Sequence, residues 1–98
     1  MGGDLQVKEG HWKLFSVKPY ECCVYVCPDE SGGLYAYIPT LPGVVSEGDS
    51  EEEVIKNIAD AFRGAASSYN ESKMPIPWKR EAEPKPHGAK ELRIVVDV

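Results

Sequence analysis

Residues 35–53, YAYIPTLPGVVSEGDSEEE, constrain the fold more than any other part of this chain. The segment opens with residues that favour β-strands. Pro39 and Pro42 then each fix φ and remove a backbone donor, so the sheet ladder must pause there. Gly43 permits a turn conformation that a side chain resists, and two valines restart an extended run. The segment predicts two strands joined by a structural corner made of Pro39, Leu41, Pro42 and Gly43.

A helix is expected directly after the second of these strands. Ser50 followed by Glu53 has the spacing of a capping box, in which the hydroxyl and the carboxylate each accept a backbone N–H at the helix start. Glu51 and Glu52 add negative charge to the first turn, where the helix dipole favours it. Apolar residues then recur at three- and four-residue steps as far as Tyr69, which gives the helix one apolar stripe.

Alternating apolar residues predict strands over 20–27, 34–38, 44–47 and 92–98. The element order is therefore β-β-β-α-β, an α+β fold in which an antiparallel sheet carries one helix on one face. The second face of the sheet holds Tyr25, Tyr35 and Tyr37. A single helix cannot cover both faces, so we expect this face to be an open contact surface. An arm formed by residues 11–18 is the alternative cover.

Composition and charge narrow the range of functions that the chain can have. Of 98 residues, 42% are hydrophobic and 28% are charged, as in one globular domain with a modest core. The net charge is −5, and because phosphate affinity comes from Lys and Arg, direct binding to nucleic acid is not expected. No apolar run approaches the ~20 residues of a membrane helix. The N-terminal residues MGGDLQVKEG lack the apolar stretch of a secretory signal, so we expect a cytoplasmic protein.

Three cysteines, Cys22, Cys23 and Cys27, lie in the first predicted strand. Cys23 and Cys27 share a face, but four residues of strand separate them by ~13 Å, too far for a disulfide or one metal ion. Cys22 points to the other face. We expect these side chains to fill the sheet as small apolar groups, and unpaired cysteines also fit a reducing compartment.

Catalysis is not expected. A ribonuclease H-like site needs several carboxylates that converge on magnesium. None of the candidates falls on a buried strand in such a cluster: Asp29, Glu30, Glu47, Asp49 and Asp60. The two histidines have no nearby cysteine or acidic partner, and neither the serine motif G-x-S-x-G nor a phosphate-binding loop is present. We expect no catalytic residue, no cofactor and no metal.

The order Y-x-Y-x-P-x-L-P-G-x-x-S-x-G-D-S-x-E-E resembles the HicB family of antitoxin-like proteins. Residues 24–33 resemble the family's first strand and its acidic, glycine-rich hairpin loop, and residues 75–77 resemble its proline pair after the helix. The resemblance covers roughly residues 19–77, followed by the last strand. Thr40 stands where the family usually carries an acidic residue. No segment resembles the tail with which many members bind operator DNA.

The resemblance divides the chain into an N-terminal extension, residues 1–18, and a HicB-like domain, residues 19–98. It implies a fold similar to a truncated ribonuclease H or double-stranded-RNA-binding domain. It also implies a non-catalytic antitoxin that neutralises a small, basic, HicA-like RNA-cleaving toxin by docking against it, and the acidic net charge agrees with such a partner. The residues expected to bind the partner are Tyr25, Tyr35, Tyr37, Glu47, Asp49, Glu51 and Glu52.

We also expect a homodimer or a higher homo-oligomer, because the uncovered face and the strand edges need a partner. The alternative function is a homo-oligomeric regulatory or RNA-linked domain that has no toxin partner. Aromatic side chains on a sheet can stack bases. Between residues 20 and 70, however, the basic residues are only Lys56 and Arg63, which disfavours a groove for phosphates.

Overall fold

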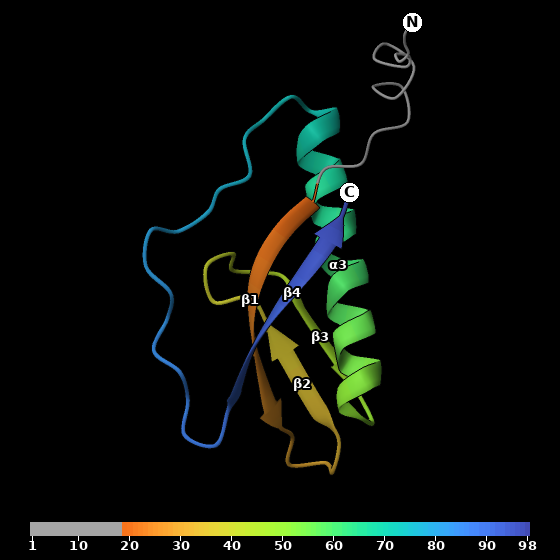
Figure 1. Cartoon of the computed structure of the whole chain (residues 1–98), viewed down its shortest axis with the longest axis vertical. Helices are drawn as coiled ribbons and strands as arrows, with labels where there is room; N and C mark the ends of the chain where they lie inside the picture. Colours follow the sequence, from red (N-terminus) through yellow and green to blue (C-terminus); the bar gives the residue numbers. More distant parts are fainter. Residues whose placement is uncertain (1–18) are drawn as a thin grey trace, which may run out of the picture.

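The computed structural model describes residues 19–98, and it contains the predicted helix and every predicted strand (Figure 1). The elements are β1 (Pro19–Pro28), β2 (Leu34–Tyr37), β3 (Val45–Gly48), α3 (Glu51–Glu71) and β4 (Lys90–Asp97). The predicted α+β class and the β-β-β-α-β order are confirmed. The predicted extension over residues 1–18, with its arm at 11–18, lies outside the described residues. Within residues 19–98, no helix combines the length and apolar character needed to cross a membrane.

The four strands form one antiparallel sheet in the order β3-β2-β1-β4. β1 pairs with β2 so that Tyr25 lies opposite Tyr37, and β2 pairs with β3 so that Tyr37 lies opposite Val45. On its other side β1 pairs with β4, with Cys22 opposite Ile94. The edges of the sheet are therefore the short strand β3 and the longer strand β4.

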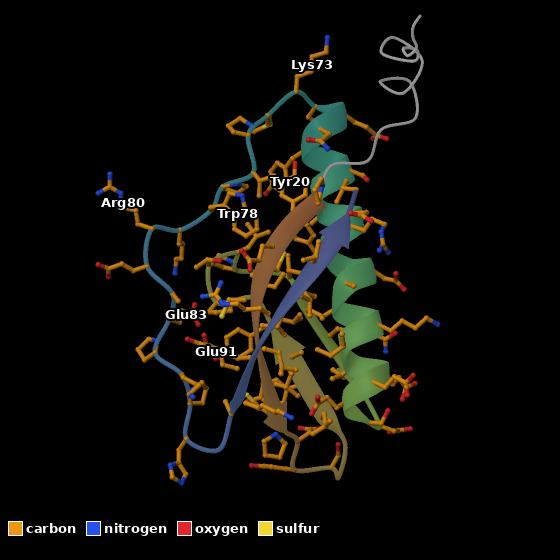
Figure 2. The ribbon with its side chains drawn as sticks, viewed as in Figure 1. Tyr20, Lys73, Trp78, Arg80, Glu83 and Glu91 are labelled. Carbon is orange, nitrogen blue, oxygen red and sulfur yellow. The ribbon has the colours of Figure 1, made fainter. Side chains whose placement is uncertain are left out.

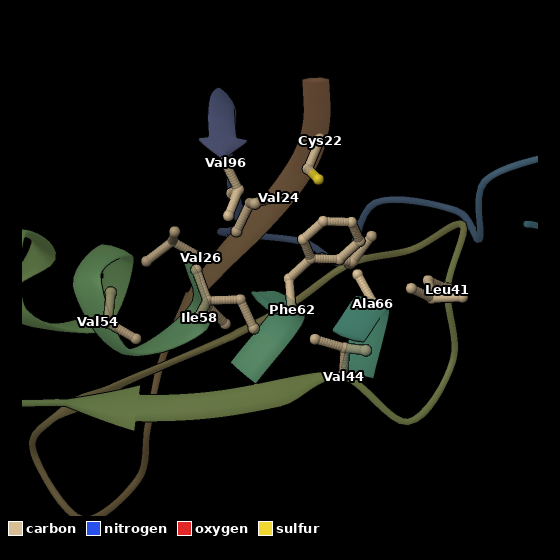
Figure 3. Close-up of a cluster of buried hydrophobic side chains, with 12 residues drawn as sticks. Cys22, Val24, Val26, Leu41, Val44, Val54, Ile58, Phe62, Ala66 and Val96 are labelled. Carbon is tan, nitrogen blue, oxygen red and sulfur yellow. The ribbon is translucent and has the colours of Figure 1, made fainter. Parts of the chain in front are cut away.

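The core lies between one face of the sheet and α3 (Figure 3). Four buried helix residues follow each other at four-residue steps: Val54, Ile58, Phe62 and Ala66. This spacing places them on one side of the helix, as the apolar stripe predicted. The Phe62 ring meets the Tyr20 ring edge-on, with 5.4 Å between ring centres. Cys22 is also in this cluster, and burial raises the pKa of its thiol to about 11, so it packs as a neutral side chain.

The proline-rich corner between β2 and β3 consists of two successive turns. The Leu41 N–H donates to the Ile38 carbonyl over 3.0 Å, and the Val44 N–H donates to the Leu41 carbonyl over 3.4 Å. A proline occupies the second position of each turn, where its fixed φ fits. Gly43 follows with φ of +97°, in the left-handed region that favours glycine. Leu41 is 2% exposed, so the corner is anchored in the core.

The first turn of α3 departs in one detail from the expected capping box. Ser50 has extended backbone angles, and its Oγ accepts the Glu53 N–H over 3.1 Å. The Glu53 carboxylate accepts the Asp49 N–H over 2.8 Å, one residue before the predicted donor. The Glu51 carboxylate lies 3.0 Å from Lys90 Nζ. The helix start is therefore tied both to the turn before it and to β4.

Residues 72–89, called here the connecting loop, lead from the end of α3 to the start of β4 at the opposite end of the sheet (Figure 1). Near the beginning of the loop, the Trp78 ring lies 5.7 Å from the Phe62 ring. The Lys79 N–H donates to the Thr40 carbonyl over 2.8 Å. The first part of the connecting loop is thus held against the core and the proline-rich corner.

Candidate partner-binding site

The side of the sheet away from α3 carries the three tyrosines that the sequence singles out. Cross-strand pairing arranges the side chains of β1, β2 and β3 in two adjacent rows: Tyr25, Tyr37 and Val45 in one, and Cys27, Tyr35 and Glu47 in the other. We call this surface the tyrosine face. Its rows follow from the period of two along each strand, because alternate residues of an antiparallel sheet share a side.

The aromatic rings of the tyrosine face contact one another in sequence. Tyr25 and Tyr37 meet edge to face, with 5.6 Å between ring centres and 85° between ring planes. Tyr37 and Tyr35 stack, with 6.4 Å between ring centres and 13° between planes. Exposure rises along the series: Tyr25 is 6% exposed, Tyr37 is half-buried and Tyr35 is 38% exposed. Tyr25 therefore supports the other rings, whereas Tyr35 is available for contact with a partner.

The tyrosine face is less open than the sequence predicts. The prediction assumed that only a helix or the N-terminal arm covers a sheet face. The connecting loop instead closes over the β1 part, where the Tyr25 hydroxyl donates to the Glu83 carbonyl over 3.1 Å. Figure 2 shows Glu83 on the loop, on the opposite side of β1 from α3. The part that remains open is the β2–β3 end, where Tyr35 lies near Val45, which is 63% exposed.

The surroundings of the three phenols favour their neutral form. Burial is the main cause that raises the pKa of Tyr25 and of Tyr37. For Tyr35 the main cause of the raised pKa is a hydrogen bond with the Cys27 side chain. Nearby acidic groups, including Glu83 and Asp29, act in the same direction. At neutral pH the phenols therefore remain hydrogen-bond donors on an apolar surface.

Two shallow hollows border the open end of the tyrosine face. One has a volume of about 320 Å³ and is lined by Asp29, Tyr35, Val45, Ser46 and Glu47. The other, of about 380 Å³, lies between the β1–β2 turn and the helix start and is lined by Asp29, Ser31, Gly32, Gly33, Leu34, Glu47, Gly48, Asp49 and Glu53. Both hollows include Asp29 and Glu47, so the exposed Tyr35 ring lies beside an acidic rim.

The four acidic residues predicted to bind the partner differ in their surroundings. Glu47 and Asp49 lie at the second hollow, close to the tyrosine face. Glu51 is engaged by Lys90, so its charge is partly neutralised within the chain. Glu52 is exposed and makes no ion pair with any residue between 19 and 98. Glu51 is therefore less suited to attract a partner than the sequence predicts.

Sequence reasoning did not include Asp29, Val45 or Glu83 in this site. Asp29 reaches it because the β1–β2 turn lies beside the end of β3, where a Cβ on Gly33 would come within 2.9 Å of the Gly48 carbonyl oxygen. That close approach of two backbones leaves no room for a side chain at Gly33. The place of Val45 on the tyrosine face follows from the register of β3, in which Val45 lies opposite Tyr37. The position of Glu83 depends on the path of the connecting loop beyond Trp78, where the sequence has no periodic apolar pattern.

The carboxylates that were expected to be dispersed are partly brought together. Asp29, Glu47 and Asp49 line the same hollow. Among residues 19–98, however, no group of three or more His, Cys, Asp or Glu side chains is placed to hold a metal ion. The hydroxyl of Ser31 also engages the Asp29 carboxylate, as is usual in a glycine-rich turn.

The architecture is a four-stranded antiparallel sheet backed by one helix, with an aromatic surface on the side away from that helix. This is the fold of the HicB N-terminal domain. The chain is similar to the crystal structure of the N-terminal domain of the Burkholderia pseudomallei antitoxin HicB, with a TM-score of 0.63 and 24% identity over 81% of this chain and 100% of that chain. It is also similar to a chain of the HicA3–HicB3 toxin–antitoxin complex, with a TM-score of 0.60, 17% identity and the same coverage.

The predicted resemblance to HicB is therefore confirmed at the level of the fold. No protein-family model matches the sequence, and no curated protein matches it.

Proposed function

We propose that this chain is a non-catalytic, antitoxin-like protein whose tyrosine face binds a small basic protein of the HicA type. The observation that carries the proposal is the exposed Tyr35 ring, which stacks on Tyr37 and is flanked by Glu47 and Asp29. Tyrosines presented on a rigid sheet are common anchors of protein interfaces, because they bury much area with little loss of side-chain freedom. The similarity to a chain of a toxin–antitoxin complex supports a toxin as the partner.

The distribution of charge supports a basic partner. Carboxylates border the exposed ring, and Glu52 extends the negative surface onto the first turn of α3. Charges at the rim of an interface mainly accelerate the encounter of two proteins. Exposed charges are screened within ~10 Å at 0.1 M salt, so the proposed association slows as salt is added.

The three residues of the tyrosine face that carry phenol rings have different roles in this proposal. Tyr35 forms the contact, Tyr37 sets the plane of its ring, and Tyr25 holds the connecting loop. Truncating Tyr35 therefore removes contact area without opening the core, whereas truncating Tyr25 disturbs both the rings and the loop. We place this function in residues 19–98, with residues 1–18 as an extension, and in the cytoplasm, where free thiols such as those of Cys22 and Cys27 are kept reduced.

The experiment is an inhibition assay with purified HicA-like toxins encoded in the same genome. Toxin-catalysed cleavage of RNA is followed with increasing amounts of this chain. We expect stoichiometric inhibition by the wild type and no cleavage by the chain alone. Tyr35→Ala inhibits more weakly, whereas Met74→Ala, which truncates another exposed apolar side chain far along the sequence, inhibits like the wild type. If the chain inhibits none of these toxins, or cleaves RNA itself, the proposed function is wrong.

A further inference from the structure

The edge of the sheet formed by β4 has no strand beside it among residues 19–98, since β4 pairs only with β1. β4 spans Lys90–Asp97 and so presents a long row of backbone donors and acceptors at this edge. On the face of β4 away from α3, Val95 is 68% exposed, the most exposed large apolar side chain of the described part of the chain. The edge therefore combines backbone that is unpaired within residues 19–98 with an exposed apolar side chain, and both features favour the addition of another strand.

We propose that two copies of this chain pair in antiparallel fashion through β4, with Val95 opposite the same residue of the second copy. In this register Arg93 of each copy lies opposite Asp97 of the other. The symmetric interface therefore contains one apolar pair flanked by two pairs of opposite charge. On the helix side of the sheet Ile94 lies opposite Val96, and Leu92 lies opposite Val98, so apolar residues also meet there.

The other symmetric registers fit less well. Centring the pair on Ile94 places Glu91 opposite Asp97, and centring it on Arg93 brings two guanidinium groups together. Like charges directly opposite each other destabilise a strand pair. Centring on Leu92 pairs Glu91 with Arg93, but it places Val95 beyond the paired strand and leaves it exposed. Only the register centred on Val95 both joins opposite charges and covers the valine.

The charged groups of this interface are available for a partner. The Arg93 guanidinium lies 3.9 Å from the Glu21 carboxylate, and both side chains are about two-thirds exposed, so this ion pair is weak. The Asp97 carboxylate makes no ion pair within residues 19–98, although the Asp97 carbonyl accepts a bond from Arg63 Nε over 3.0 Å. That bond fixes the end of β4 against α3.

Pairing through β4 leaves the tyrosine face free. The order β3-β2-β1-β4 places β4 at the edge opposite β3, and the exposed Tyr35 and Val45 belong to the β2–β3 end. Two copies joined through β4 therefore form one continuous sheet with a tyrosine face near each outer end. The two-fold assembly and the binding of a partner do not compete, and each can be tested without the other.

The test is a charge exchange followed by sedimentation velocity on the full-length chain at tens of micromolar. We expect the wild type to be a dimer. Arg93→Asp and Asp97→Arg each set like charges against each other at two symmetric positions, which raises the dimer dissociation constant on the order of tenfold. A mixture of these two single variants restores opposite charges at both positions, so the mixture forms dimers again. A role of either residue in folding alone gives no such recovery.

A cross-linking experiment checks the register. Opposed residues of an antiparallel pair have Cα atoms ~4.5–5.5 Å apart, within the range of a disulfide. Val95→Cys therefore oxidises to a covalent dimer, whereas Asp97→Cys, offset by four residues of strand from its counterpart, does not. The wild type controls for the native thiols. A monomeric wild type overturns the proposal. A dimer that is unaffected by the charge exchange and forms no cross-link through Val95→Cys also overturns it.

Discussion

The junction between β3 and α3 gives the sharpest prediction about stability. A Cβ at position 48 would lie 2.8 Å from the Val54 nitrogen and 3.0 Å from the Val54 Cα. Ordinary contacts between such atoms begin near 3.5 Å, so the helix start must move by roughly half an ångström in Gly48→Ala. The atoms in the way belong to the backbone and cannot rotate aside. We expect a loss of about 2 kcal/mol in the free energy of unfolding, within the range for overpacked sites.

A second glycine supplies the matched control. Gly64 lies on the exposed side of α3, and a Cβ there meets no atom within 4 Å. Gly64→Ala should therefore stabilise the chain by about 1 kcal/mol, because glycine is a poor helix former. For a domain of this size 1 kcal/mol corresponds to roughly 4–8 °C in Tm. Urea and thermal unfolding of both variants should give shifts of opposite sign. A Gly48→Ala variant as stable as the wild type would refute the packing argument.

Three further predictions concern the corner, the tyrosines and the acidic rim. Gly43→Val should lower Tm, because φ is +97° at that position; an unchanged Tm with lost toxin binding would make the corner a recognition element instead. Because the folded chain raises the pKa of Tyr25 above its usual value near 10, the free energy of unfolding should fall as pH rises above about 10, and urea unfolding of Tyr25→Phe should show a smaller fall. Glu47→Gln combined with Glu52→Gln should slow toxin association at low salt, measured by stopped flow, and the difference should vanish at high salt.

The sequence predicts a helix or strand well where a periodic apolar pattern begins or ends at a residue that caps or interrupts the element. The capping serine and the apolar steps of α3 place the helix, and the prolines place the corner between β2 and β3. The details that differ depend on exact backbone positions. The Glu53 carboxylate takes its hydrogen bond from Asp49 rather than Ser50, a shift of one residue that the spacing alone cannot determine.

The candidate site could be predicted only in part. Alternation along β1 and β2 assigns the tyrosines to one face, and the register then brings Tyr35 beside Tyr37. The cover over Tyr25 could not be predicted, because beyond Trp78 the connecting loop has prolines and charged residues but no apolar period that would reveal its course. The pairing of Glu51 with Lys90 could not be predicted either, since those residues lie far apart in the sequence and meet through tertiary structure.

The central claim is that the tyrosine face is the surface that binds the toxin. The most direct measurement is the dissociation rate of the toxin complex formed by Tyr35→Ala, compared with that of Met74→Ala. Both variants truncate an exposed apolar side chain, and both should unfold like the wild type. We expect Tyr35→Ala to dissociate at least tenfold faster, as for an interface anchor, while Met74→Ala matches the wild type. Equal dissociation rates for the two complexes would contradict the claim.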